Sequence, residues 1–228
     1  MALTLIIGNK NYSSWSLRPW IAMTAAGIAF DEVAIPLYEP GSREAILKYS
    51  PAGKVPVLID SDRHIWESLA ILEYLAEKFP NARLWPADAG ARAHARVVAN
   101  EMHAGFQPLR RACPMNMWLP PKARPQSEEV LADVARIDAI WSECRGRFGK
   151  GGPFLFGPFG AADAMYAPVV ARFHTYGIPV GRDARAYMEA VMGLPAWAEW
   201  TAAALKEPWV MRHNEPDWPV VRGIKLSQ

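Results

Sequence analysis

The sequence is poor in cysteine, with only Cys113 and Cys144 among its 228 residues. Two thiols are too few for the disulfide framework that stabilises small secreted domains. A chain of this length can bury a core large enough to fold without disulfides or metals. Residues 1–7 also lack the basic segment of a signal peptide, and they read as a strand. We therefore expect a protein of the reducing cytoplasm.

Neither sign of charge is in excess, because 25 Lys and Arg against 23 Asp and Glu give a net charge of +2. This balance does not favour binding to nucleic acid or to an anionic membrane surface. Long hydrophobic runs are also missing, since no stretch approaches the roughly 18 apolar residues of a transmembrane helix. Apolar residues nevertheless make up 51% of the chain, which is typical of a folded globular protein.

Several catalytic motifs are absent from the sequence. It contains no G-x-S-x-G, H-E-x-x-H or C-x-x-C, so neither a nucleophile elbow nor a helical zinc site is expected. The five histidines, at positions 64, 94, 103, 174 and 213, show no spacing typical of metal ligands. Residues 149–152 resemble a phosphate loop only superficially, because no Ser or Thr follows the lysine. We expect no metal site.

Hydrophobic patterns in the first eighty residues predict an α/β domain. Short apolar runs bounded by turn residues predict strands, and apolar residues three and four apart predict helices. The predicted strands are 3–7, 30–37, 55–59 and 64–66, and the predicted helices are 16–26, 43–49 and 67–79. The order is βαβ, then a ββ hairpin, then a helix.

The remainder of the chain is predicted to be helical. Pro80, Pro86 and Gly90 interrupt the pattern, so we place a linker over 81–90, between a domain of residues 1–80 and a domain of residues 91–228. The predicted helices are 91–111 (with a kink near Gly105 and Pro108), 127–148, 161–176, 184–192 and 195–206.

A serine-rich loop, Tyr12-Ser13-Ser14-Trp15-Ser16, joins the first strand to the first helix. Hydroxyl groups at this position lie beside the free N–H groups and the positive dipole end of the helix, which favours an anion. The alternative is that Ser14 or Ser16 only caps the helix.

A second pattern combines Val55-Pro56 with Glu67-Ser68. A proline that opens a strand is often cis, and the free edge of Val55 would pair with an extended peptide. Ser68 at a helix start would bind a carboxylate, and Glu67 would accept from an ammonium group. This set of groups fits a short γ-glutamyl peptide, although helix capping alone would also explain Glu67 and Ser68.

Taken together, these features resemble the glutathione transferase family over nearly the whole chain. The resemblance implies a thioredoxin-like α/β domain followed by an all-α helical domain. The serine loop is most similar to the zeta-type S-S-C-x-x-R pattern, and Glu67-Ser68 matches the [E/Q]-S pair that holds the γ-glutamyl end of glutathione. By this resemblance, Val55 pairs through its main chain with the cysteinyl unit, and Pro56 is the cis-proline. The implied glutathione-binding residues are Lys54, Val55, Pro56, Glu67 and Ser68.

Two departures from the family pattern stand out. Trp15 occupies the place of the zeta-type cysteine, which counts against cysteine-based chemistry. Gly160 stands where the folding motif of the helical domain has Ser or Thr, so Asp163 must do more of the helix capping.

The resemblance implies that glutathione, as co-substrate, attacks a small apolar electrophile or reduces a hydroperoxide. Ser14 is the first choice for activating the thiol, Ser13 is favoured by the zeta alignment, and Tyr12 is the third choice. A glutathione-dependent isomerase and a non-catalytic binding or regulatory protein are the alternatives. Family members usually form two-fold dimers, so we expect a homodimer.

The electrophile pocket is expected between the two domains. Its predicted residues are Tyr12, Trp15, Arg110, Arg111, Met115, Met117 and Trp118. Ordinary packing at a helix end is the alternative for each of them. The Pro-rich tail with Trp209 and Trp218 would fold back over this cleft. Cys113 and Cys144 are interpreted as buried structural thiols.

Overall fold

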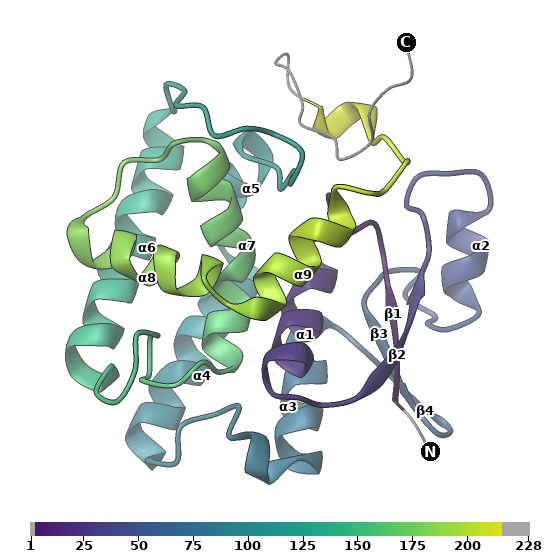
Figure 1. Ribbon diagram of the computed structural model, residues 1–228, viewed down its shortest axis with the longest axis horizontal. Coiled ribbons are helices and arrows are strands. Elements are labelled where there is room, and N and C mark those ends of the chain that lie inside the picture. The colour runs from purple at the N-terminus through teal and green to yellow at the C-terminus, as the bar shows by residue number, and fades with distance from the viewer. Residues whose placement is uncertain (1–2, 216–228) are drawn as a thin grey trace.

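In the computed structural model, which describes residues 3–215, a small α/β part is followed by a bundle of helices (Figure 1). The α/β part consists of β1 (Leu3–Ile7), α1 (Ser14–Ala25), β2 (Phe30–Ala34), α2 (Ser42–Leu47), β3 (Val57–Asp60), β4 (Arg63–Trp66) and α3 (Ser68–Lys78). The thioredoxin-like order predicted from the sequence is confirmed. Trp218 lies outside the described residues.

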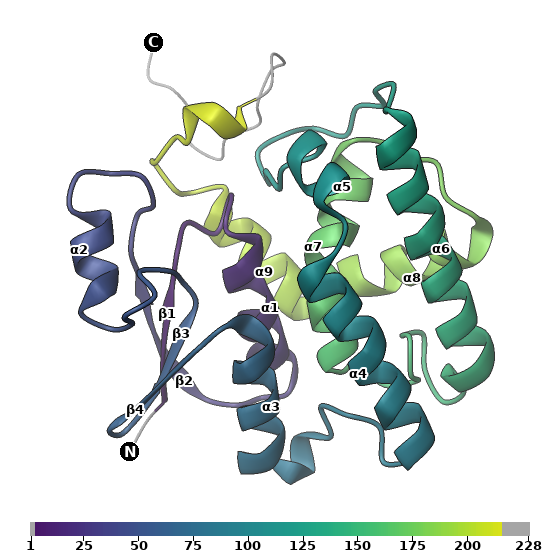
Figure 2. The ribbon, with the colours of Figure 1, turned by 180° about the vertical axis from the view of Figure 1, so that it is seen from behind.

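The four strands form one mixed sheet in the order β2-β1-β3-β4. β1 pairs with β2 in parallel and with β3 antiparallel, and β3 pairs antiparallel with β4. Alternate residues of β1 serve the two faces: Leu5 and Ile7 belong to the main core, whereas Ile6 packs with Ile46 of α2. The sheet therefore lies between α2 on one side and α1 and α3 on the other (Figures 1 and 2).

Two predicted strand boundaries were wrong. β3 begins at Val57 and not at Val55. Pro56 has no N–H to donate to a ladder, so pairing starts only after it. β2 is also shorter than predicted and ends at Ala34.

The second part of the chain consists of the short 3₁₀ helix η1 (Pro80–Ala82) and then α4 (Ala89–Ala104), α5 (Gln107–Ala112), α6 (Glu128–Phe148), α7 (Ala161–Thr175), α8 (Arg182–Met192), α9 (Pro195–Ala204) and η2 (Arg212–Asn214). None of the helices in residues 3–215 is long and apolar enough to cross a membrane. The predicted single helix over 91–111 was wrong. Gly105 is extended, Phe106 has a φ of 60°, and Pro108 cannot continue the hydrogen bonds of α4.

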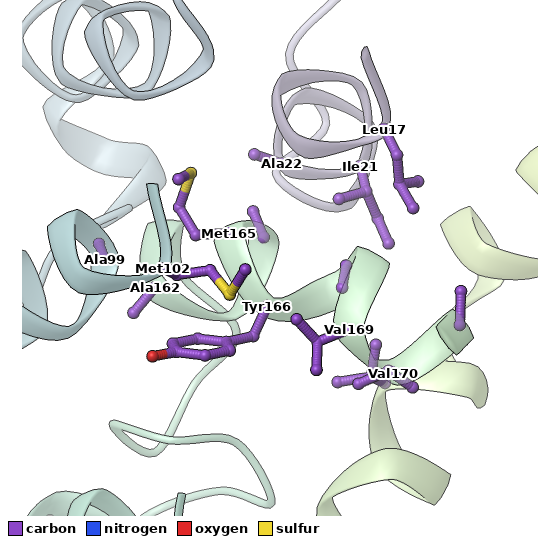
Figure 3. Close-up of a cluster of buried hydrophobic side chains, with 14 of the residues drawn as sticks. Leu17, Ile21, Ala22, Ala99, Met102, Ala162, Met165, Tyr166, Val169 and Val170 are labelled. Carbon is purple, nitrogen blue, oxygen red and sulfur yellow. The ribbon is translucent and has the colours of Figure 1, made fainter. Parts of the chain in front are cut away.

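Helix α7 is the centre of the core. It is buried on nearly all sides, as expected for a helix that is apolar all round. Leu17 and Ile21 of α1 pack on one side of it, and Met102 of α4 packs on the other (Figure 3). This cluster joins the α/β part to the helical part, and we keep the domain bounds 1–80 and 91–228 as a proposal.

Asp163 caps the start of α7. Its Oδ2 accepts from the N–H of Gly160 (2.9 Å), and its Oδ1 accepts from the N–H of Leu155 (3.0 Å). Gly160 is required by space, because a Cβ there would lie 2.7 Å from the carbonyl oxygen of Leu84. The glycine that departs from the family pattern is thus explained by close backbone approach, and Asp163 alone carries the side-chain cap.

Asp163 predicts a pH dependence of stability. Burial raises the pKa of Asp163 from its ordinary 3.8 to about 6, so the folded chain binds this proton more tightly than the unfolded chain. The resulting contribution to the free energy of unfolding is full below pH 4 and is lost as the pH rises to 6, a change of about 3 kcal/mol. In urea unfolding, we expect the free energy of unfolding of wild type to fall relative to that of Asp163→Asn as the pH rises from 4 to 6. Asp88→Asn, which removes the charge of the exposed N-cap of α4 but keeps its accepting oxygen, is the control, and parallel profiles of wild type and Asp163→Asn would contradict the account.

Candidate functional site

The loop before α1 is fixed by hydrogen bonds from distant parts of the chain. The N–H groups of Lys10 and Asn11 donate to the two carboxylate oxygens of Glu207, at 2.6 and 2.9 Å. The side chain of Asn11 accepts from the N–H of Trp118 at 3.1 Å, and that of Asn9 accepts from the N–H of Leu37 at 2.7 Å. The serine loop is therefore held from both the sheet and the helical part.

The two candidate serines differ in their hydrogen bonds. Ser13 is the N-cap of α1: its Oγ accepts from the N–H of Ser16 (3.4 Å) and lies 2.8 Å from Ser16 Oγ. Ser14 Oγ accepts from Nη2 of Arg172 (3.2 Å). Within residues 3–215 we find no acceptor for the Ser14 hydroxyl proton. Ser14 is therefore the serine with a proton to donate to a ligand.

Val55 presents an unpaired edge next to this loop. The Val55–Pro56 peptide bond is cis, as predicted. Val55 precedes β3, and its main chain forms no hydrogen bond with another residue of the described part of the chain. Both its N–H and its C=O are therefore available to an extended ligand.

Glu67 and Ser68 meet at the start of α3. Glu67 has a φ of 69° and a ψ of 122°, a region that side-chain-bearing residues rarely occupy and that costs about 1–3 kcal/mol. Its carboxylate is half exposed and lies 3.8 Å from His103 Nε2. Ser68 is buried as the first residue of α3, where the backbone N–H groups are free. A carboxylate that can bind a cation therefore lies next to a helix start that can bind an anion.

Two cavities connect these groups. The serine cavity, about 770 Å³, and the Glu67 cavity, about 450 Å³, share Trp15, Lys54 and Val55, so they lie side by side, and we call the two together the groove. The serine cavity is lined by Tyr12, Ser13, Ser14, Trp15, Leu37, Tyr38, Glu39, Pro40, Ser42, Arg43, Ile46, Gly53, Lys54, Val55, Met211 and Asn214. The Glu67 cavity is lined by Trp15, Lys54, Val55, Pro56, Trp66, Glu67, Ser68, His103 and Ala104.

Most of the segment predicted to form the electrophile pocket does not line these two cavities. Of the predicted pocket residues, Tyr12 and Trp15 line the groove, whereas Arg110, Arg111, Met115, Met117 and Trp118 line neither of its cavities. After α5 the chain turns inward, so Met115 and Trp118 are buried, and the indole N–H of Trp118 donates to the carbonyl of Ala204 (2.8 Å). The wall comes instead from the loop 37–40, from α2 and from the C-terminal segment.

The C-terminal segment reaches the groove through Met211 and Asn214. The Tyr12 hydroxyl donates to Glu215, and the side chain of Asn116 donates to the same carboxylate at 3.1 Å. Burial raises the pKa of Tyr12 above its ordinary value, and the Glu215 carboxylate adds to this shift. Tyr12 is therefore held as a neutral phenol that anchors the tail, which agrees with the expected return of the chain to the cleft.

The remaining candidates are structural. Cys113 and Cys144 are buried free thiols, and burial raises their pKa to about 11 and about 12. They are therefore poor nucleophiles at neutral pH. Within residues 3–215, no cluster of three or more His, Cys, Asp or Glu side chains could hold a metal ion.

Comparison with known proteins places the groove in a family context. A family model described as the N-terminal domain of glutathione S-transferase matches residues 12–78, and one described as its C-terminal domain matches residues 121–203. A solved glutathione transferase homolog from Burkholderia, with bound glutathione, has a TM-score of 0.69 at 21% identity and covers 90% of this chain and 98% of its own. This likeness shows the fold.

Curated relatives have several names. A probable maleylacetoacetate isomerase of Caenorhabditis elegans is 36% identical over 100 residues, which are 44% of this chain and 46% of the relative. A zeta class glutathione S-transferase of Euphorbia esula is 30% identical over 146 residues, 61% of this chain and 64% of the relative. A stringent starvation protein A homolog of Coxiella burnetii is 25% identical over 178 residues, 78% and 79% of the two chains. The first two matches thus span about half to two thirds of those relatives.

The backbone of Glu67 allows a test of the strain at this site. We expect Glu67→Gly to raise the free energy of unfolding by about 1 kcal/mol, because glycine adopts a positive φ without strain. Glu77→Gly, at an exposed position in the last turn of the same helix, should lower it by up to about 1 kcal/mol. Chemical denaturation of both variants measures the two signs, and destabilisation by Glu67→Gly would show that the strain is absent.

Proposed function

Because the chain belongs to the glutathione S-transferase family, we propose that it binds glutathione in this groove and transfers the glutathione thiolate to a small apolar electrophile. The observation that carries the proposal is the continuity of the groove from Glu67 and Ser68, past the free edge of Val55, to Ser14. The compartment we propose is the cytoplasm.

Each part of glutathione has a matching group in the groove. The γ-glutamyl ammonium would lie at the Glu67 carboxylate, and its α-carboxylate at the hydroxyl and N–H groups that open α3 beside Ser68. The cysteinyl unit would pair with Val55 through two backbone hydrogen bonds. Lys54, which lines both cavities, offers a cation to a ligand carboxylate. In this pose the sulfur lies near the serine loop.

The chemical role of the protein is to favour the thiolate over the thiol. A thiol with a pKa near 8.5 is only a few per cent ionised at neutral pH. A hydrogen bond from Ser14, together with the N-terminus of α1, would lower that pKa by about two units, or roughly 2.7 kcal/mol. The thiolate then forms a bond to the electrophilic carbon while the leaving group departs with its electron pair. Holding both reactants in the groove lowers the barrier further.

The walls of the serine cavity suit an apolar electrophile. Leu37, Ile46 and Met211 give an adaptable apolar surface beside Ser14. The same thiolate could attack a hydroperoxide, releasing an alcohol; a second glutathione would then give glutathione disulfide and water.

Two other functions find support among the relatives. Those named maleylacetoacetate isomerase favour a glutathione-dependent isomerase. Trp15, in place of the zeta-type cysteine, argues against it. The relatives named stringent starvation protein A homolog have a name that states no enzymatic activity, so a non-catalytic regulatory protein is kept as the second alternative. An interaction module would have no need for Ser14, Glu67 and Ser68 in one groove, so we rank the transferase first.

Calorimetric titration with glutathione tests the proposal. We expect wild type to bind glutathione at micromolar to millimolar concentration, and Ser68→Ala to bind at least tenfold more weakly, since a charge-assisted hydrogen bond is worth about 1.5–3 kcal/mol. Ser142→Ala, on the exposed surface of α6, is the matched control and should bind like wild type.

The outcomes separate the three functions. Absence of binding to folded wild type would reject the transferase and isomerase together and leave the regulatory protein. Given binding, turnover of an aromatic halide or a cumyl hydroperoxide supports the transferase, whereas turnover of maleylacetoacetate alone supports the isomerase.

We also propose that the protein forms the two-fold dimer usual in its family, with the α/β part of one chain against the helical part of the other. Val97 on α4 is 60% exposed in the single chain, so it is available to be buried by a partner subunit in such a dimer. We expect Val97→Glu to shift wild-type dimers towards monomers in sedimentation analysis. Leu131→Glu, on α6 away from the sheet (Figure 1), should leave the dimer intact. A monomeric wild type would exclude the dimer.

A further inference from the structure

Arg172 is a charged residue of α7 whose guanidinium is buried next to the serine loop. Its Nη1 donates to the carbonyl oxygens of Cys113 and Arg110, the latter at 3.3 Å. Its Nη2 donates to Ser14 Oγ at 3.2 Å. Nη1 therefore connects α7 to the end of α5, and Nη2 donates a hydrogen bond to the hydroxyl group that lines the groove.

The surroundings of Arg172 contain other positive charges. Arg18 of α1 and Arg110 of α5 both contact the ring of Trp15, with their guanidinium carbons 4.0 and 4.8 Å from the ring centroid. Within residues 3–215, neither Arg18 nor Arg172 forms an ion pair with a carboxylate. Burial lowers the pKa of both Arg18 and Arg172, and the neighbouring positive charge of Arg110 lowers both further. A buried group of like charges favours an anion close by.

The hydrogen bond also sets the direction of the Ser14 proton. A hydroxyl has one proton and two acceptor lone pairs. When Arg172 donates to one lone pair, the proton turns away from the guanidinium, and the donated bond makes the hydroxyl a stronger donor. The serine cavity lies on the side that remains, since Ser14 lines it.

We propose that Arg172 is a positioning residue that acts through Ser14: it orients the Ser14 hydroxyl towards the sulfur of bound glutathione and stabilises the thiolate. This role rests on the proposed binding of glutathione. In the step concerned, the thiol loses its proton to water and the sulfur keeps the electron pair. Ser14 remains protonated throughout and donates a hydrogen bond to the thiolate.

A purely structural role for Arg172 would be served by Nη1 alone, because both backbone carbonyls bind that nitrogen. The hydrogen bond from Nη2 to Ser14 is not needed for these contacts with the backbone. The pKa of bound glutathione is therefore the property that distinguishes the two roles.

The experiment is a pH titration of the ultraviolet absorbance of the thiolate of glutathione bound to the dimeric or monomeric full chain. We expect Arg172→Met to raise the thiol pKa by about one unit relative to wild type. Arg172→Lys, which keeps a charge and a donor, should give a smaller rise. Arg185→Lys, exposed on α8, is the matched control and should leave the pKa unchanged.

A double-mutant cycle tests whether the effect passes through Ser14. Ser14→Ala should raise the thiol pKa by itself, and adding Arg172→Met should raise it no further. If Arg172→Met does not fold, Arg172→Lys and Ser14→Ala/Arg172→Lys complete the same cycle. The glutathione dissociation constant is measured in parallel, and we expect it to change less than threefold in the Arg172 variants.

The outcomes are distinct. Wild type that binds glutathione, with an unchanged thiol pKa in the folded Arg172 variants, overturns the role of Arg172 and leaves the proposed function standing. A rise that persists in the Ser14→Ala background overturns the route through Ser14. Wild type that binds no glutathione overturns both proposals.

Discussion

The position of the serine loop depends on the packing of α1 against α7. Leu17 and Ile21 of α1 lie against α7 in the main core (Figure 3). The Arg18 Nε donates to the carbonyl oxygen of Met165 at 3.1 Å, which fixes the helices along their length. Since α1 begins at Ser14, this packing also fixes its first turn and the free N–H groups there. The site is thus built on the joint between the two parts of the chain, so that neither part alone holds Ser14 in place.

The groove combines this well-packed joint with strained and unsatisfied backbone. The N–H and C=O of Val55 have no hydrogen-bond partner in the described part of the chain, and Glu67 has a positive φ. The unpaired backbone of Val55 and the positive φ of Glu67 each lower the stability of the fold, and both residues line the groove. Such costs are retained where the surrounding structure fixes the backbone and a ligand can satisfy it. The hydrogen bonds around Asn9, Asn11 and Glu207 supply that support from three separate segments.

Local patterns were sufficient to predict most of the fold. Strand 3–7 and helix 127–148 were predicted correctly within a residue or two, because burial on one face gives each a clear period. The groove residues Glu67 and Ser68 were found because helix starts carry a recognisable chemistry. The burial of Trp118 could not be foreseen, because it depends on Ala204 and Asn11, which are far from it in the sequence. For the same reason the contact of Arg172 with Ser14, across 158 positions, has no local signal.

Trp15 stands where the zeta-type pattern has a cysteine, and the two arginines that it contacts suggest a reason. The indole ring lies against Arg18 and Arg110, so its negative face contacts two guanidinium groups that form no ion pair with a carboxylate within residues 3–215. A thiol at this place would bring a second nucleophile into the groove and would leave both cations less well covered. In the reaction proposed above, the positive charge of this region acts on the groove through the hydrogen bond from Arg172 to Ser14, and the reacting sulfur comes from the ligand. The position of Trp15 against these two cations is therefore consistent with a site whose thiol is supplied by the ligand.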